Sequence, residues 1–475
     1  MQKKVVLGIF ICFFISGQIW AQDFGFGFSD EAGTSSDLGS SNPISVLISG
    51  EVSTAVIGYL NEIYDGPEHI NTRDMFMFSG NLNFSARSSF AEGVINLKLV
   101  PALVPVSIDE AYIRAFFGNL DITAGLRKVS WGKADQFGPL DIINLPDQSR
   151  IFIEMADNNN LNSVRIANPV IHASYRFGQF SKIEGIFLPS YEIVSMAVST
   201  AVNPNPLMAL ITSPVSERWI PEQMRMLREA VRGNSDLIIM PDTSGLDYAQ
   251  AGLRFTTTLG SADIGMQYFF GRMFQPAVRV SYNPAYDPLN PASLPIESVE
   301  FLFNKYHQIG IDYAQVLAGF NIRAEVAANI TEDIEGNDGN IYNPSIGWSF
   351  GFDRDIFAGL NINLQANGSI RLLNDRIGSD NPFDPNFDIE GGTSMTATRL
   401  TAIFSRRFLR DELELRTAVV WGIEDMDFAI IPAVVWTRED LRVAFSGGFF
   451  FGNSDGQIGQ YSDNHFLKIS VAYMF

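Results

Sequence analysis

The residues most suggestive of chemistry are a histidine and a serine placed two positions apart, His172 and Ser174. On an extended strand, residues two apart share a face, so this pair could in principle serve a lipase as base and nucleophile. Ala173 and Tyr175 belong to the apolar side of the same strand, which puts His172 and Ser174 on its polar side. No third member of a lipase site can be identified. The favoured interpretation is therefore that both residues are ordinary polar lining of a lumen, and no catalytic residue is predicted.

Other reactive residues are sparse. The four histidines are scattered and include no pair at metal-ligand spacing. The single cysteine, Cys12, lies in the apolar run near the N-terminus. Serine-hydrolase elbows, phosphate loops and dinucleotide fingerprints are absent from the sequence. A formal net charge of −20 is unsuited to phosphate binding. The sequence therefore predicts no enzyme, no metal, no cofactor and no nucleic-acid partner.

The strongest local signal is a run of charged and turn-forming residues at 125–147. Gly, Pro, Asn and Asp fix turns, so an ordered loop is expected here. Two interpretations are open. The loop folds inward and lines a substrate path, with Trp131 as an apolar platform and Arg127, Asp135 and Asp141 as polar contacts. Alternatively, carboxylate–backbone and carboxylate–arginine bonds attach it to the surrounding wall.

The elements that would position these residues are strands. Apolar and polar side chains alternate along nearly the whole chain, as with Ile362 and Leu364 against Asn363 and Gln365. Segments of about ten such residues suit tilted strands that cross a bilayer, with lipid outside and water inside. Every second connection is short, which favours a barrel with both termini on the periplasmic side. Eighteen strands are predicted, starting near residues 44, 74, 91, 106, 119, 161, 180, 246, 261, 301, 319, 345, 360, 395, 411, 427, 440 and 465.

Both ends of the chain indicate export to the outer membrane. Residues 1–21 have the charged start, short apolar run and small final residue of a signal peptide, and residues 22–43 are expected to form a flexible leader. The barrel is predicted over residues 44–475. Its last strand alternates up to Tyr473 and Phe475, and it resembles the signal recognised by the barrel assembly machinery. Beyond the predicted signal peptide, no apolar stretch approaches the roughly 20 residues that a membrane helix needs.

A helix is predicted in the long outer connection 191–245. Ile220, Met224, Leu227 and Val231 follow helical spacing, and the helix either narrows the barrel mouth or caps the loop from outside. Charged residues on the polar side of the strands are expected to line the lumen, where they either set ion selectivity or pair with neighbours. Together with the loop residues above, the predicted pore-lining positions are Arg114, Arg323, Glu325, Arg371, Glu414 and Arg416.

The loop also resembles a poorly characterised family of bacterial outer-membrane porin-like barrels. Its members show a Gly-Arg/Lys…Trp-Gly-x-x-Asp…Pro-x-Asp…Asn-Pro-x-Asp pattern. This chain departs from the pattern by placing Leu145 between Asn144 and Pro146. A looser resemblance covers residues 449–464. The resemblance implies a barrel that passes lipid-like or other small molecules, and it supplies no catalytic residues. The matching positions are Gly125, Arg127 or Lys128, Trp131, Gly132, Asp135, Pro139, Asp141, Asn144, Pro146 and Asp147.

The predicted fold is thus all-β, a transmembrane antiparallel up-and-down β-barrel of about 18 strands in which a long outer loop carries a short helix. The predicted function is passive passage of small solutes or hydrophobic molecules across the bacterial outer membrane. A surface adhesin or structural barrel is the alternative, and a lipid or fatty-acid conduit is a further one. The expected partners are outer-membrane lipids, the assembly machinery and a small-molecule or lipid substrate. Formation of an oligomer is left open.

Overall fold

The structure is a computed structural model of the 475-residue chain. The predicted signal peptide and leader lie outside the residues that it describes. The described residues are 44–61, 76–100, 104–136, 138–144, 151–157, 161–191, 219, 231, 234–286, 289, 295–356, 359–377, 385–386, 395–454 and 456–475.

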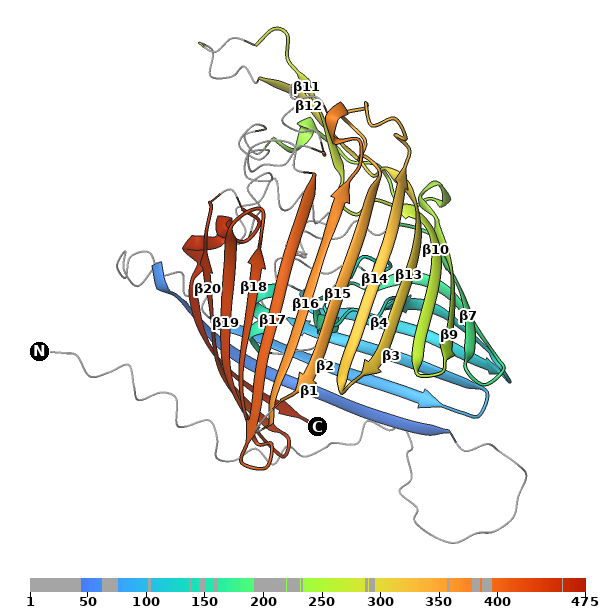
Figure 1. The fold of residues 1–475 in the computed structure, drawn as a ribbon, viewed down its shortest axis with the longest axis vertical. Coiled ribbons are helices and arrows are strands. Elements are labelled where there is room, and N and C mark those ends of the chain that lie inside the picture. The colour runs from blue at the N-terminus through green and yellow to red at the C-terminus, as the bar shows by residue number, and fades with distance from the viewer. Residues whose placement is uncertain are drawn as a thin grey trace, which may run out of the picture. The chain divides into compact units, whose positions relative to one another are not determined.

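A single closed sheet of 18 strands dominates the fold (Figure 1). Each strand pairs antiparallel with the next one along the barrel wall, as predicted from the alternation. The strands are β1 (Ser45–Tyr59), β2 (Phe76–Arg87), β3 (Ala91–Val100), β4 (Val104–Phe117), β5 (Leu120–Arg127), β6 (Asn168–Phe177), β7 (Ser181–Leu188), β9 (Gln250–Leu259), β10 (Ala262–Arg272), β13 (Lys305–Leu317), β14 (Phe320–Thr331), β15 (Ser345–Asp355), β16 (Leu360–Arg371), β17 (Thr396–Phe408), β18 (Leu413–Gly422), β19 (Asp427–Arg438), β20 (Leu441–Phe451) and β21 (Phe466–Met474).

The barrel closes where β1 meets β21. Nine consecutive residue pairs join the two strands, from Glu51 opposite Met474 to Tyr59 opposite Phe466. At the seam, the Gly50 N–H donates to the Phe475 carbonyl at 2.8 Å, and the Phe475 N–H donates to the Gly50 carbonyl at 3.0 Å. The C-terminus therefore lies in the wall itself, at the end that carries the short turns (Figure 1).

Gly50 leaves room for the terminal aromatic ring. A Cβ on Gly50 would lie 2.5 Å from Cζ of Phe475 and 2.7 Å from the Asn81 carbonyl. Gly50→Val is therefore expected to open the seam at a cost of about 1–3 kcal/mol. Heating before gel electrophoresis should unfold the variant at a lower temperature than the wild type. Gly58→Val, where a Cβ meets nothing within 4 Å, should not change that temperature, and equal behaviour of the two variants would contradict the prediction.

The side-chain pattern of the barrel is the reverse of that of a water-soluble protein. Along β13, Ile309 and Ile311 are 53% and 52% exposed, whereas the flanking polar residues Gln308 and Asp312 are 1% and 0% exposed. Exposing a large aliphatic side chain to water costs about 1.5–3 kcal/mol, so an outer face built this way requires an apolar surrounding. The polar residues face inward and have partners there.

Most predicted strand starts lie within two residues of the observed ones. β9 and β13 begin four residues later than predicted, because Leu246–Tyr248 form a 3-10 helix and residue 301 belongs to a strand outside the barrel sheet. The largest difference is at β6. Alternation placed this strand near 161, but residues Leu161–Val164 form the 3-10 helix η3 and β6 begins at Asn168. The connections at the end where β1 begins and β21 ends are short, and those at the other end are mostly long, although residues 423–426 make a short turn there. Several short turns use a glycine in the left-handed region, such as Gly118 at φ 64° and Gly178 at φ 61°.

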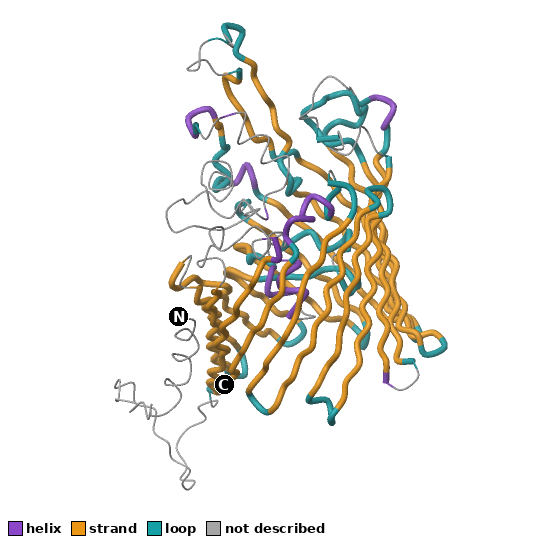
Figure 2. The backbone as a smooth tube through the Cα atoms, turned by 90° about the vertical axis from the view of Figure 1, so that its left-hand side faces the viewer, coloured by secondary structure: helices purple, strands orange, loops and turns teal. Residues whose placement is uncertain are grey.

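The remaining described elements are small. The strands β8 (Ile238–Ile239), β11 (Ala277–Tyr282) and β12 (Ile296–Leu302) form a separate sheet beyond the long-loop end of the barrel (Figure 1). Figure 2 shows short helices among the loops and between the strands. No helix among the described residues is both long and apolar enough to cross a membrane. The helical elements are α3 (Ile151–Asp157), η3, η5 (Ser235–Leu237), η6 (Leu246–Tyr248), η8 (Asn374–Arg376) and η9 (Gly459–Asn464).

Candidate functional site

The connection between β5 and β6 enters the barrel. Its first part, residues 128–144 without residue 137, is called the inner loop here. The inner loop contacts inward-facing side chains of β10, β13, β14 and β16, and α3 then packs against β19 and β20. These strands lie far from β5 around the ring. One connection therefore crosses the lumen and reaches the wall on more than one side.

Glu325 of β14 is the main attachment point for the inner loop. Its side chain is almost fully buried, at 1% exposure. The backbone N–H groups of Lys133, Ala134 and Leu140 all donate to its carboxylate, the latter two at 2.7 and 3.4 Å. A carboxylate that accepts several backbone N–H groups satisfies donors that a tight turn would otherwise leave unpaired.

Amide side chains of the wall hold the carbonyl groups of the same turn. Gln267 of β10 donates to the Leu140 carbonyl at 3.1 Å, and Gln308 of β13 donates to the Pro139 carbonyl at 3.0 Å. Gln267 in turn accepts from Arg254 at 2.7 Å, and Arg254 is 2.6 Å from the buried carboxylate of Asp312. The inner loop is thus attached to a connected polar network rather than to isolated side chains.

Glycines in the wall make room for the loop side chains. A Cβ on Gly310 would lie 2.1 Å from Cδ2 of Leu140, and one on Gly347 would lie 2.7 Å from Cβ of Pro139. Gly252 does the same for Trp131, whose ring carbons would lie 2.8 and 2.9 Å from its Cβ. The inner loop therefore fits the wall by shape as well as by hydrogen bonding.

Within the inner loop, buried polar side chains fix the path of the chain. Asn144, fully buried, accepts the Val129 N–H and donates to the carbonyls of Arg127 and Ile166 at 3.3 and 2.7 Å. Arg165 forms a two-pronged pair with Asp141, in which Nη1 lies 2.8 Å from Oδ1. These contacts pin the two ends of the inner loop together.

The structure thus accounts for most of the described residues of the loop motif by their contacts. Gly125 and Gly132 adopt φ values of 138° and 97°, and a Cβ on Gly132 would lie 2.5 Å from the Glu325 carboxylate. Asp135 binds Arg323 and accepts from Asn363 at 2.9 Å. The inward fold and the attachment to the wall, set out above as alternatives, therefore occur together. Pro146 and Asp147 lie outside the described residues.

Trp131, predicted to be an apolar platform on a substrate path, is buried in the structure. Its side chain is 3% exposed and packs with Val129, Ile143 and Phe269 against the wall. Gly252 leaves space for the indole against the wall. In this position the apolar ring is removed from water, which stabilises the fold, whereas a ring that faced the lumen would stay hydrated. In this structure Trp131 holds the inner loop and offers no open platform to a solute.

Burial raises the pKa of Asp141 from its ordinary value near 3.8 to about 6, against the lowering effect of the Arg165 guanidinium. The Asp141 carboxyl group therefore holds its proton more tightly in the folded chain than in the unfolded chain. The resulting stabilisation is complete below pH 3.8 and is lost as the pH rises through about 6. Relative to Asp141→Asn, the wild type should lose on the order of 3 kcal/mol of unfolding free energy between about pH 4 and pH 7. Urea unfolding in detergent at both pH values tests this, and parallel profiles would contradict it.

The second part of the connection fills another side of the lumen. Nη2 of Arg416, on β18, donates to the carbonyls of Met155 and Ala156 at the end of α3, at 3.0 and 3.1 Å. Ile153 and Met155 pack with inward-facing apolar residues of β19, β20 and β21, among them Phe450. This part of the inner wall is therefore apolar and is covered by α3.

The other predicted pore-lining residues lie on the inner wall with partners. Arg323 bridges Asp135 and Asp353, the latter at 2.6 Å. Arg371 donates to the carbonyl of Asn386, and Glu414 is 3.7 Å from Arg407. Of the predicted constriction helix, Ile220, Met224 and Leu227 lie outside the described residues, whereas Val231 is helical and fully buried.

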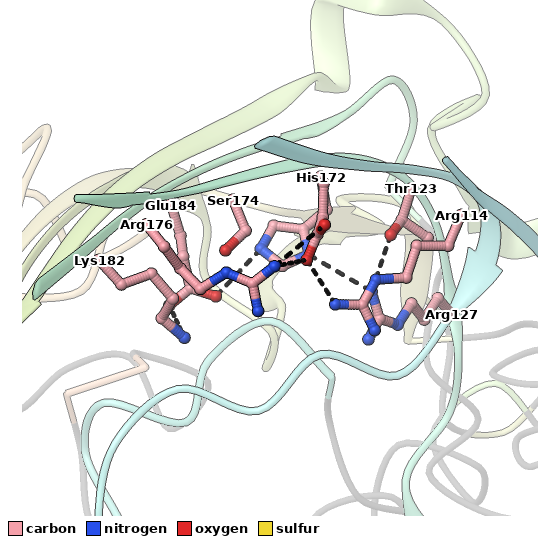
Figure 3. A pocket seen from close by; sticks show the side chains of 9 residues that line it. Arg114, Thr123, Arg127, His172, Ser174, Arg176, Lys182 and Glu184 are labelled. Atoms are coloured by element: carbon pink, nitrogen blue, oxygen red, sulfur yellow. Dashed lines mark hydrogen bonds and ion pairs between the residues drawn. The ribbon is translucent and has the colours of Figure 1, made fainter. Parts of the chain in front are cut away.

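Arg114, Arg127 and the His172–Ser174 pair line one cavity of about 250 Å³ on the inner wall formed by β4 to β7 (Figure 3). Nε2 of His172 lies 3.2 Å from Oε1 of Glu184, and its Nδ1 lies 3.4 Å from Arg127. The carboxylate of Glu184 was not predicted to join this group. It is placed there by register, since Ser174 lies opposite Glu184 on β7. Both ring nitrogens of His172 face these two residues, so the ring is held as part of the wall.

No family model and no curated protein matches the chain. Solved structures match it at low identity. OpdL of Pseudomonas aeruginosa is 9% identical, with 91% of this chain and 98% of that chain covered and a TM-score of 0.47. A BenF-like porin from Pseudomonas fluorescens Pf-5 is 7% identical, with 90% and 98% covered and a TM-score of 0.48. OmpF of Salmonella typhi, solved in complex with daunomycin, is 7% identical, with 90% and 97% covered and a TM-score of 0.40.

Proposed function

We propose that this protein is a passive channel of the bacterial outer membrane for small polar solutes, narrowed by its inner loop. One observation supports this most strongly: the closed barrel has an apolar outer face and a charged inner face. Such a wall suits lipid on one side and water on the other. Eighteen strands enclose more space than their own side chains fill, and the inner loop occupies part of it.

The charges of the lumen favour polar solutes over lipids. The apolar part of the inner wall, on β19 to β21, is covered by α3, so a lipid would have to displace a packed helix to reach it. The cavity beside the inner loop is lined instead by charged and hydroxyl side chains. A lipid or fatty-acid conduit therefore has less support than a polar channel.

Assembly of the channel is proposed to depend on its last strand. Tyr473 faces outward at 53% exposure, and Phe475 closes the seam with Gly50. An exposed aromatic strand end is a surface that the barrel assembly machinery could bind before closure. Outer-membrane lipids would then cover the exposed apolar belt.

Planar-bilayer recording of the refolded chain tests the proposed function. Steady, ohmic single-channel currents are expected in potassium chloride, because water and ions fill a charged lumen. Protein that has been heat-unfolded before addition is the control. Absence of current from chain that migrates as a folded barrel would contradict the channel and favour an adhesin or structural barrel.

A further inference from the structure

The cavity on β4 to β7 combines exposed cations with buried carboxylates. The side chains of Arg114, Arg176 and Lys182 are 33%, 57% and 39% exposed. Those of Asp121 and Glu184 are only 5% and 9% exposed. The cations are therefore open to the cavity, whereas the carboxylates beside them are buried.

The carboxylates hold the cations in place. Asp121 is 2.7 Å from Arg114 and 3.4 Å from Arg176, and Glu184 is 2.9 Å from Lys182. Long basic side chains lose rotamer entropy when they bind a ligand, so fixing them beforehand favours binding. Two buried carboxylates thus preorganise three cations.

Arg127 adds a fourth cation without a carboxylate of its own. Among the described residues, its guanidinium contacts Thr123 at 3.1 Å, Nδ1 of His172 at 3.4 Å and the ring of Tyr112 at 5.0 Å. These contacts include no carboxylate, so they position the guanidinium without pairing its charge. With four cations and two carboxylates, the cavity carries an excess of positive charge in a chain whose net charge is −20.

We infer that this cavity binds the anionic group of a passing solute, a carboxylate or a phosphate, with Arg127 and Arg176 as its principal contacts. Planar guanidinium groups bind both anions through paired N–H donors, and rings of arginine and lysine favour anions in pores. Arg127 ends β5, where the inner loop begins, so the site lies beside the narrowed part of the lumen. This inference rests on the proposed channel function only in that the bound anion would be a solute on its way through the lumen.

Binding can be measured without conduction. Isothermal titration of succinate and of inorganic phosphate into the refolded, detergent-solubilised full chain should show saturable binding of at least one of them. Arg127→Gln and Arg176→Gln should each weaken it by about tenfold, because each removes one charged donor pair. Arg279→Gln is the matched control, since Arg279 pairs with Glu300 on an exposed strand of the separate small sheet.

Each outcome is decisive. Saturable binding that both cavity variants weaken and Arg279→Gln does not would support the site. Binding of succinate alone would restrict its ligands to carboxylates. Absence of binding in the wild type would overturn the inference. So would an affinity in Arg127→Gln and Arg176→Gln that equals the affinity of the wild type and of Arg279→Gln. Arg176 is the more exposed of the two arginines, so its variant keeps the test available if Arg127→Gln does not fold. Missing bilayer currents with intact binding would instead reject the channel and leave the site.

Discussion

Glu325→Ala is expected to release the inner loop and raise single-channel conductance by about twofold or more. The substitution removes the acceptor shared by three backbone N–H groups. Leaving a buried donor without a partner costs about 1–3 kcal/mol, which the inner loop avoids by moving into the aqueous lumen. The current should also become noisier, because a detached loop samples several positions.

Glu332→Ala is the control for this variant. Glu332 follows β14 directly and is exposed, lying 3.8 Å from Lys305. Its removal deletes the same functional group from the same region without touching the inner loop. Conductance at the wild-type level in folded Glu325→Ala would show that the carboxylate does not hold the constriction.

Gly310→Val is expected to give the same widened channel by a steric route. Its Cβ would lie 2.1 Å from Leu140, which is completely buried, and 3.3 Å from the backbone carbonyl of Val326. The strand cannot retreat without breaking its ladder to β14, so the inner loop must shift. A rise in conductance of roughly twofold is expected from this release.

A glycine at an open outer position provides the comparison for Gly310→Val. At Gly58 a Cβ meets nothing within 4 Å, so Gly58→Val should conduct as the wild type does. Charge is unchanged in both variants. A Gly310→Val channel with unaltered conductance would therefore speak against shape-dependent seating of the inner loop, independently of the Glu325 result.

The barrel itself could be predicted from the sequence because the alternation in each strand is a local signal. A strand that separates lipid from water must place apolar residues on one face, as Ile309 and Ile311 do against Gln308 and Asp312. The start of β6 was misplaced by contrast, because residues 161–167 precede the strand and serve the inner loop through Arg165.

The partners of the inner loop could not be predicted from the sequence in the same way. Glu325 lies about 190 positions from the N–H groups that it accepts. Which inward residue meets the loop depends on the cumulative register of every strand between them. The pattern identified Glu325 as lumenal, but its role as an acceptor for backbone groups emerges only from the closed barrel.

Glycine positions in the wall illustrate the same limit. In a strand, glycine indicates only weak packing or a close approach, and Gly310 and Gly347 carry no sign of what approaches them. Similarly, Arg114 and Arg127 were predicted to line the lumen, whereas the carboxylates behind the cavity, Asp121 and Glu184, follow from their register opposite Ser174.

The central claim is that the inner loop narrows the lumen. It is tested most directly by the single-channel conductance of a chain in which residues 130–142 are replaced by a short Gly-Ser linker. A conductance larger than that of the unaltered chain in the same salt is predicted, since the anchored turn and its side chains leave the lumen. An equal or smaller conductance, from protein that still migrates as a folded barrel before heating, would contradict the claim.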